Sequence, residues 1–509
     1  MQVTPQNILP CSIKTKHSKI ADPFLMIIFG GGGDLSCKQL IPSIFRLFEG
    51  KKIQQFTAIG IGRTPMTDIQ YRDKLKNCLK HTLKSKFNDH QWKKFSANIF
   101  YLIGDANQLA LYQELCNRIS AFKKQYKKNS IIYYLSVQPS LVCTIVNSLS
   151  REKLCRNEAN SKIILEKPFG HDRKSALALN KKLSSAFDEQ QIYRIDHYLG
   201  KQTVQNILFF RFGNTIFEPL WNRNYISHIE ITVSESIGIE NRGTFYEETG
   251  IIRDMVQNHI MQLMALVTME PPVGFDADLI RDEKVKALQS VRILDKASLK
   301  EHMVIGQYGR GKIGNKMVPA YRDEPHVNPH SNVPTYFAGR FFIDNWRFGG
   351  VPIYVRTGKR LARQLTQIVI QFKHPPLKLF QDSCDSIDPN RLMITISPHE
   401  KISLQFGVKS PGAINCAYPV NMVFDYQNAF KIVPYSAYAR LLLDCIKGDL
   451  TLFARHDGID TMWSIIDPIL SYAEKCSIHN QCVRYPAGTW GPTQANQLIE
   501  QDGFQWINE

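Results

Sequence analysis

The sequence predicts two successive units: an α/β domain with a doubly wound parallel sheet, then an α+β domain built on a large antiparallel sheet. Three observations lead to this prediction. Short apolar segments alternate with helical segments up to about residue 199, which is the pattern of a parallel sheet with helices on both faces. A run of four glycines follows the first apolar segment. Beyond residue 199 apolar and polar residues alternate, as in strands with one buried face.

The first unit is expected to contain five buried strands. Phe24–Phe29 is uninterrupted apolar, as in a parallel strand that is covered on both faces. A helix is predicted at Asp34–Phe48, directly after the glycines. The other four strands are expected at Phe56–Gly62, Ile99–Gly104, Ile131–Val137 and Lys162–Lys167.

The second unit shows period-two alternation and one long helical stretch. A helix at Leu199–Arg211 precedes a strand at Tyr225–Glu235, and the long helical stretch is predicted near Tyr246–Met269. Further strands are expected at Phe337–Ile343, Pro352–Arg356, Ile368–Phe372, Leu392–Ile396 and Ile402–Phe406. These patterns predict a tail at residues 1–21, a first domain at 22–198 and a second domain at 199–509.

Length and composition are those of a globular protein without a membrane partner. The 509 residues are 43% apolar, and no apolar run approaches the roughly 20 residues of a membrane-spanning helix. Residues 1–21 lack the apolar segment of a secretory signal. Eleven cysteines without a C-x-x-C pair predict neither a disulfide framework nor a zinc motif. We therefore expect a cytoplasmic protein with reduced thiols.

Positive charge is concentrated in the first part of the chain. The formal net charge is +17, and residues 1–200 hold 31 basic and 15 acidic side chains against 32 and 31 in the remainder. This asymmetry predicts an anionic partner, either nucleic acid or a small phosphorylated ligand. Solvated helix faces are the alternative for lysine pairs such as Lys93 and Lys94. Because no nucleic-acid-binding motif accompanies the charge, we expect no nucleic-acid partner.

The glycine run Gly30–Gly33 indicates a phosphate-binding turn between a strand and a helix. Glycines let the backbone turn tightly and approach a pyrophosphate, whose charge is stabilised at the helix N-terminus. The match to G-x-G-x-x-G is incomplete because Leu35 occupies the last position, and a flexible turn is the alternative. A Rossmann-type dinucleotide site would use Gly30, Gly33, Asp34 and Leu35.

Arg63 follows the second predicted strand and bears on the choice of cofactor. Sites for NAD usually place an acidic residue there, where it binds the ribose 2′-hydroxyl. The planar guanidinium of an arginine suits a 2′-phosphate instead. A solvated surface arginine is the alternative, but its place after an apolar strand favours NADP.

The segment Arg194–Lys201 gathers side chains that suit a phosphorylated substrate. His197, Tyr198 and Lys201 can converge on a phosphomonoester, and Asp196 can orient a histidine. The alternative is a domain junction with incidental polar residues.

Three further polar residues lie in apolar surroundings. Asp254 and His259 are five residues apart on the long helix, which places them on different faces of an α-helix, so the sequence does not pair them. A lone histidine in such a helix is more often a core residue than a catalyst. Glu235 is in phase with the apolar residues of its strand, so its carboxylate needs a partner, such as a ligand hydroxyl.

In combination these motifs resemble the glucose-6-phosphate 1-dehydrogenase family. Gly30–Pro42, Glu166–Gly170, Arg194–Lys201 and Gly250–His259 occur in the order and at the spacings of that family. Further matches are Arg281–Val285, Gly306–Tyr308, Val351–Leu361, Arg440–Phe453 and Tyr485–Pro492. The resemblance implies oxidation of D-glucose 6-phosphate at C1 to 6-phosphogluconolactone with hydride transfer to NADP⁺, the first step of the oxidative pentose phosphate pathway.

The resemblance also implies roles for individual residues. His259 matches the general base, and Asp196 matches the carboxylate that orients it. The residues that match the substrate site are His197, Tyr198 and Lys201 for the phosphate, Glu235 and Asp254 for sugar hydroxyls, Lys359, and Lys167 near both substrate and cofactor, followed by Pro168, which matches a cis-proline.

No metal site is expected, because the loop with His326 and His330 offers no third ligand. The large sheet offers an association surface for a homodimer or a homotetramer.

Three glutamines depart from the family pattern. Gln39 and Gln364 stand where a basic residue is usual, and Gln138 stands where a proline is usual. Because a charge-assisted hydrogen bond contributes about 1.5–3 kcal/mol, we expect intact chemistry with weaker ligand affinity. The alternative is a catalytically weakened paralogue that serves as a binding or assembly protein; the retained base, acid and phosphate-binding lysine oppose it.

Overall fold

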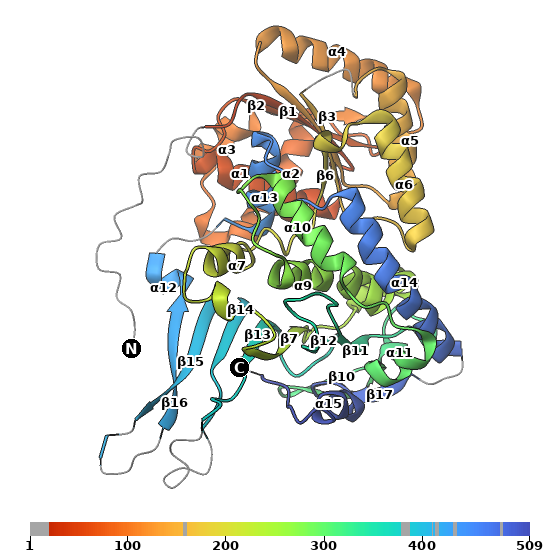
Figure 1. Ribbon diagram of the computed structural model, residues 1–509. Coiled ribbons are helices and arrows are strands. Elements are labelled where there is room, and N and C mark those ends of the chain that lie inside the picture. The colour runs from red at the N-terminus through yellow and green to blue at the C-terminus, as the bar shows by residue number, and fades with distance from the viewer. Residues whose placement is uncertain are drawn as a thin grey trace.

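The computed structural model describes residues 20–155, 160–377, 387–409, 411–412, 417–430, 435–478 and 482–508. In this part of the chain a six-stranded sheet forms the upper domain of Figure 1, and a nine-stranded sheet forms the lower domain. A bundle of helices lies between the two sheets and carries part of the candidate site.

The first sheet is parallel throughout and has the order β3-β2-β1-β4-β5-β6. Its strands are β1 (Phe24–Phe29), β2 (Phe56–Gly62), β3 (Ile99–Ile103), β4 (Ser130–Leu135), β5 (Ser161–Leu165) and β6 (Ile192–Arg194). The predicted doubly wound fold and its five strands are confirmed. The three residues of β6 were not predicted, because so short a strand has no recognisable period.

Helices cover both faces of this sheet, as its uninterrupted apolar strands require. One face packs on α1 (Ile41–Glu49), α2 (Asp68–Leu83), α3 (Asp89–Ser96) and α13 (Ala437–Lys447). The other face packs on α4 (Leu109–Gln125), α5 (Pro139–Arg151) and α6 (Arg173–Ala186). Thus α13 comes from late in the chain, but Leu441 and Leu442 share a core with Phe24 and Met26.

The second sheet has the order β16-β15-β14-β13-β7-β12-β11-β8-β17. Its strands are β7 (Ile226–Ser234), β8 (Met303–Gly309), β11 (Tyr336–Phe341), β12 (Ile353–Gly358), β13 (Leu365–Phe372), β14 (Arg391–Ser397), β15 (Lys401–Lys409), β16 (Ala417–Asp425) and β17 (Val483–Pro486). A separate hairpin consists of β9 (Gly311–Ile313) and β10 (Lys316–Val318).

The prediction of an antiparallel second sheet needs one correction. The pairs β7/β12 and β8/β17 are parallel, so the sheet is mixed. Alternation of apolar residues reports a half-buried face but not the direction of the neighbouring strand, which long connections decide.

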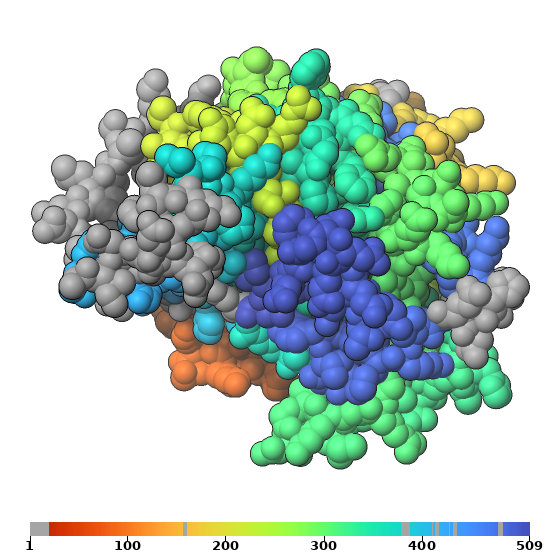
Figure 2. Space-filling model, turned by 60° about the horizontal axis from the view of Figure 1, so that its bottom comes forward, coloured from red at the N-terminus to blue at the C-terminus, as the bar shows by residue number. Residues whose placement is uncertain are grey.

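The remaining helices lie mostly around the second sheet. They are α7 (Gln202–Phe212), α8 (Gly243–Ile251), the π-helix η6 (Ile252–Ile260), α9 (Met261–Thr268), α10 (Ala277–Gln289), α11 (Lys296–His302), α12 (Tyr426–Phe430), α14 (His456–Ile478) and α15 (Thr493–Glu500). Short 3₁₀ turns are η2 (Lys84–Lys86), η3 (Glu189–Gln191), η4 (Glu218–Leu220), η5 (Glu240–Arg242) and η7 (Tyr321–Asp323). Helix α15 packs on β8 and β11, and the C-terminal segment covers the face of the molecule that is turned away from the first domain (Figure 2). Within the described ranges, no helix has the length and apolarity needed to cross a membrane.

The expectation of reduced thiols throughout is wrong for one pair of cysteines. Cys37 and Cys78 form a disulfide, and their Cα atoms lie 5.7 Å apart, within the range that such a bond requires. The pair is 41 residues apart in the sequence and meets because α2 packs against the helix that follows the glycine turn. Sequence spacing gave no signal of this contact.

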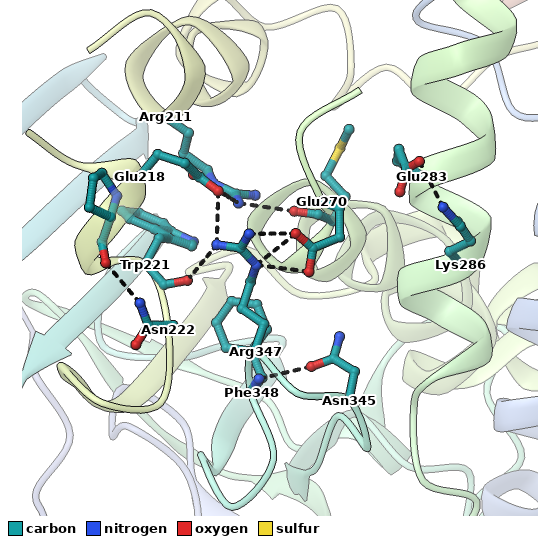
Figure 3. A network of polar contacts seen from close by, with 12 residues as sticks. Arg211, Glu218, Trp221, Asn222, Glu270, Glu283, Lys286, Asn345, Arg347 and Phe348 are labelled. Atoms are coloured by element: carbon teal, nitrogen blue, oxygen red, sulfur yellow. Dashed lines mark hydrogen bonds and ion pairs between the residues drawn. The ribbon is translucent and has the colours of Figure 1, made fainter. Parts of the chain in front are cut away.

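A cluster of charged side chains around the buried Arg211 caps the C-terminal end of α9 (Figure 3). Arg211 is fully buried and pairs with Glu218 at 3.2 Å, and Arg347 joins Glu218 to Glu270. The carbonyls that accept hydrogen bonds from Arg211, at 2.9–3.1 Å, belong to Leu266, Val267 and Met269. The last carbonyls of a helix lack intrahelical donors, so a cation at this place fixes the helix end.

We expect Arg211→Leu to destabilise the protein by about 3–5 kcal/mol, because the substitution leaves Glu218 and the helix carbonyls without their partner. Guanidinium-induced unfolding, followed by tryptophan fluorescence, measures the effect. Arg310→Leu is the matched control, because Arg310 pairs with Asp323 at the surface, where ion pairs contribute little. An equal shift of the unfolding midpoint in both variants would contradict the prediction.

Candidate active site

The carboxyl ends of the parallel strands meet at one edge of the first sheet. The glycine turn follows β1, Arg63 follows β2, Lys167 lies two residues beyond β5 and Asp196 lies two residues beyond β6. In sheets of this type ligands bind along that edge. The predicted cofactor residues and part of the predicted substrate site therefore share one edge, although they are distant in the sequence.

The glycine turn is closed to any side chain at two positions. Gly30 has a φ of +80°, and a Cβ there would lie 2.1 Å from the carbonyl oxygen of Ser136. A Cβ on Gly31 would lie 2.4 Å from the Cα of Gly60. The absence of side chains lets the backbone pass close to β2 and β4 and leaves a cradle that fits the pyrophosphate of a dinucleotide.

Helix α2 supports this turn from outside. The hydroxyl of Tyr71 donates to the carbonyl oxygen of Gly31 at 2.9 Å, and Lys74 Nζ donates to that of Gly32 at 2.7 Å. Neither residue was predicted, and their spacing of three on one helix face was the only available signal. Asp34 pairs with Lys38 at the surface, at 2.8 Å.

The helix predicted at Asp34–Phe48 is present and contains a π-helical stretch. Asp34 and Leu35 are α-helical, the π-helix η1 (Ser36–Leu40) follows them, and α1 continues the helix. Gln39 lies exposed on η1, Gln138 precedes α5 as its N-cap residue, and Gln364 is exposed in the turn between β12 and β13.

His259 and Asp196 form a buried pair. The Nδ1–H of His259 donates to Oδ1 of Asp196 at 2.5 Å, and the backbone N–H of Tyr198 donates to the same oxygen at 2.9 Å. Both side chains of the pair are almost inaccessible to solvent. Because Nδ1 is engaged by the carboxylate, Nε2 is the ring atom that can accept a proton.

Burial and nearby charges set the protonation of this pair. Burial lowers the pKa of His259; the Asp196 carboxylate opposes this effect, and the Lys167 ammonium adds to it. Burial alone would raise the pKa of Asp196, but the adjacent His259 holds it below the usual value. The arrangement favours a neutral imidazole beside an ionised carboxylate at neutral pH.

Asp254 and His259 lie on the same side of their helix, so the prediction of different faces is wrong. In an α-helix, residues five apart differ by about 140° around the axis. The segment is the π-helix η6, in which hydrogen bonds join residues five apart and one turn spans more than four residues. Lys167 contacts both side chains: its Nζ lies 3.1 Å from Asp254 Oδ1 and 2.8 Å from His259 Nε2.

Glu235 has the partner that its apolar surroundings require, and that partner is Lys359. The buried ammonium of Lys359 donates to the Glu235 carboxylate and, at 3.2 Å, to Oδ2 of Asp254. Two lysines thus serve Asp254: burial opposes its ionisation, but Lys167 and Lys359 hold its pKa low. The expected ligand hydroxyl is not needed to compensate Glu235.

The residues predicted for a phosphate surround the ring of His259. Tyr198 stacks on that ring with centroids 4.2 Å apart, and His197 meets it edge-on at 4.6 Å. Lys201 Nζ lies 4.3 Å from the centroid of the Tyr198 ring. Burial lowers the pKa of His197 to about 3; the ammonium groups of Lys167 and Lys201 add to this effect, and the Asp196 carboxylate opposes it.

These groups line one cavity of about 390 Å³. Of the predicted substrate and catalytic residues, Lys167, His197, Tyr198, Glu235, Asp254, His259 and Lys359 line it. Asp196 lies behind His259, and Lys201 lies behind Tyr198. Lining residues that the sequence did not single out include Arg242, Phe245, Thr249, Gln257 and Asn258.

Two family models together cover almost the whole chain. Residues 27–206 match the glucose-6-phosphate dehydrogenase NAD binding domain, and residues 208–507 match the glucose-6-phosphate dehydrogenase C-terminal domain. The chain belongs to the glucose-6-phosphate dehydrogenase family. The resemblance seen in the motifs is thereby confirmed.

Relatives and solved structures agree with this membership. The chain is 42% identical over 489 residues to glucose-6-phosphate 1-dehydrogenase of Aggregatibacter actinomycetemcomitans, covering 96% of this chain and 97% of the relative. It is 41% identical over 488 residues to the enzyme of Bacillus subtilis, covering 95% and 98%. A glucose-6-phosphate dehydrogenase solved with its substrate glucose 6-phosphate is 34% identical, with a TM-score of 0.88 over 96% of this chain and 100% of that chain.

We expect Gly31→Ala to weaken dinucleotide binding at least about tenfold, because the new Cβ must displace the backbone at Gly60. Gly32→Ala is the matched control, since the nearest atom to its Cβ is a methionine methyl at 3.6 Å. Calorimetric titration with NADP⁺ measures both variants. Equal affinities in the two variants would show that the close approach of the turn is dispensable.

We expect the pKa of the His259 imidazole to lie below 6.5, the ordinary pKa of histidine, because the effect of burial outweighs that of the Asp196 carboxylate. Asp196→Asn removes the charge that favours the imidazolium, so it should lower the midpoint further. NMR titration of ¹³C-labelled histidine reports both values, and His259→Asn identifies the resonance. A midpoint at or above 6.5 in the parent protein would contradict the electrostatic argument.

Proposed function

We propose that this protein oxidises D-glucose 6-phosphate at C1 to 6-phospho-D-glucono-1,5-lactone and passes the hydride to NADP⁺. The observation that carries the proposal is the His259–Asp196 pair, whose accepting Nε2 faces a cavity that also contains Lys167 and Asp254. Family membership and the substrate named for the solved relative agree with it. The alternative of a weakened binding protein rests on Gln39 and Gln364 alone, whereas the predicted base, its carboxylate and the lysines are in place.

The cofactor would lie along the carboxyl edge of the first sheet. The backbone at Gly30 and Gly33 and the N–H groups of Asp34 and Leu35 would hold the pyrophosphate. Arg63, exposed beyond β2, would bind the 2′-phosphate that distinguishes NADP from NAD. When bound, NADP⁺ supplies the acceptor for the hydride of C1.

The substrate would occupy the cavity with its phosphate toward His197, Tyr198 and Lys201. Glu235, Asp254 and Lys359 would bind sugar hydroxyls, exchanging part of their mutual ion pairing for hydrogen bonds to the ligand. Phosphate binding far from the reacting carbon converts binding energy into orientation of C1.

His259 would take the proton of the C1 hydroxyl on Nε2 while the hydride leaves C1 and the C1–O bond becomes a carbonyl. Asp196 stabilises the imidazolium that forms and keeps the ring oriented. The ammonium of Lys167 now lies 2.8 Å from Nε2, so the substrate hydroxyl would replace it there. Lys167 would keep its bonds to the carbonyl and carboxylate of Asp254.

We also propose a homodimer or homotetramer. Strand β16 is the edge of the second sheet, and β15 and β16 extend away from the rest of the molecule (Figure 1). Their exposed apolar side chains are Val408, Tyr418, Val420, Met422 and Val423. An edge strand with such a face suits pairing with a second copy.

The domain limits at residues 22–198 and 199–509 and the cytoplasmic location remain predictions from the sequence.

We expect His259→Asn to lower kcat with glucose 6-phosphate and NADP⁺ at least about a hundredfold, because a positioned general base contributes that much or more. The dissociation constant of glucose 6-phosphate should change little, since phosphate-binding residues are intact. NADPH absorbance and calorimetry measure the two quantities. Turnover by the variant as fast as by the parent would remove the basis of the assignment.

We expect Arg63→Ala to raise KM for NADP⁺ about 10- to 100-fold, because one charge-assisted contact to the 2′-phosphate is lost. NAD⁺ lacks that phosphate, so the rate of the same variant with NAD⁺ is the internal control. Steady-state kinetics of the parent and the variant with NADP⁺ and with NAD⁺ measures these changes. A parallel change for the two cofactors would mean that Arg63 does not read the phosphate.

A further inference from the structure

Asn258 is a buried amide on the cavity wall that the proposed mechanism does not use. It is 2% exposed and lines the cavity next to His259. Neither Oδ1 nor Nδ2 of Asn258 has a hydrogen-bond partner among the residues described. Burial of an amide without hydrogen-bond partners destabilises the folded state, so the stability of the fold does not explain an asparagine at this position.

The π-helix η6 places the Asn258 amide beside Asp254 and His259. Asn258 lies four residues after Asp254, and His259 lies five residues after it. Because a turn of η6 spans more than four residues, the two positions fall on either side of Asp254. The amide therefore belongs to the same helix face as the groups that would handle the sugar.

The hydrogen-bonding capacity of Asn258 differs from that of the two lysines in the cavity. Lys167 and Lys359 already pair with Asp254, and Lys359 also pairs with Glu235. The Asn258 side chain offers an unpaired donor and an unpaired acceptor together. A sugar hydroxyl donates one hydrogen bond and accepts others, so it can satisfy both, whereas a phosphate offers acceptors only.

Resting on the proposed function, we propose that Asn258 is a further substrate-binding residue that hydrogen-bonds one ring hydroxyl of the hexose phosphate. Its place next to His259 assigns it to the sugar ring near the reacting carbon rather than to the phosphate. Through this contact the site would recognise which ring carbon carries a hydroxyl.

The test compares glucose 6-phosphate with its 2-deoxy, 3-deoxy and 4-deoxy analogues. In Asn258→Leu, which has a side chain of similar size, kcat/KM for glucose 6-phosphate should fall about tenfold, the loss of one neutral hydrogen bond. At one of the three ring positions, removal of the hydroxyl should lower kcat/KM of the parent protein but should leave kcat/KM of Asn258→Leu unchanged. That loss of discrimination identifies the hydroxyl that Asn258 binds.

Gln262→Leu is the matched control. Gln262 is an equally buried amide one turn further along the same helical segment, where it contacts Met462 and does not line the cavity. This variant should keep the discrimination of the parent at all three positions. If Asn258→Leu fails to fold by circular dichroism, Asn258→Ala is measured in the same way.

The outcomes separate this inference from the function on which it rests. A variant that distinguishes all three analogues as the parent does would overturn the inference alone. If Asn258→Leu raises only the KM for NADP⁺, the inference is also overturned, because the amide would then contact the cofactor. A parent protein that does not turn over glucose 6-phosphate would overturn the proposed function, and this inference with it.

Discussion

The π-helical turn between Asp254 and His259 is the constraint on which the cavity depends. In an ordinary α-helix the two side chains would diverge, and Lys167 could not contact both. The turn is bounded on both sides: Gly250, at a φ of +60°, breaks the preceding helix, and Arg211 holds the carbonyls at the end of α9. Because both ends of the segment are held, it can keep a π-helical turn that the local helix propensity of the sequence would not favour.

Charge balance makes so polar a cavity compatible with a buried location. Each carboxylate on its wall has an ammonium or an imidazole as partner, and Lys167 and Lys359 each serve more than one group. Buried charges are tolerated when they are paired and hydrogen-bonded. These contacts also hold the side chains in place, so little reorganisation is required when ligand groups replace part of the pairing.

The site joins the two sheets of the molecule. Asp196 and Lys167 come from the carboxyl edge of the first sheet, whereas His259, Asp254 and Lys359 come from beyond residue 199. The short bond between His259 and Asp196 therefore crosses the boundary that the sequence predicts, and α13 crosses it again in the opposite direction. Correct packing of the two parts is a condition of the chemistry.

The sequence by itself determined five of the six strands of the first sheet, six of the nine strands of the second sheet, the glycine turn and the motif Arg194–Lys201; through the family resemblance it also indicated seven of the residues that line the cavity. Local periodicity and motif spacing carry that information. It did not determine the expanded turn that brings His259 to Asp254, the Lys359 partner of Glu235, the parallel pairs of the second sheet or the Cys37–Cys78 bond. Each of these depends on contacts between residues distant in the chain, or on a helix geometry selected by such contacts. Only the tertiary structure could decide them, because packing overrides local preference.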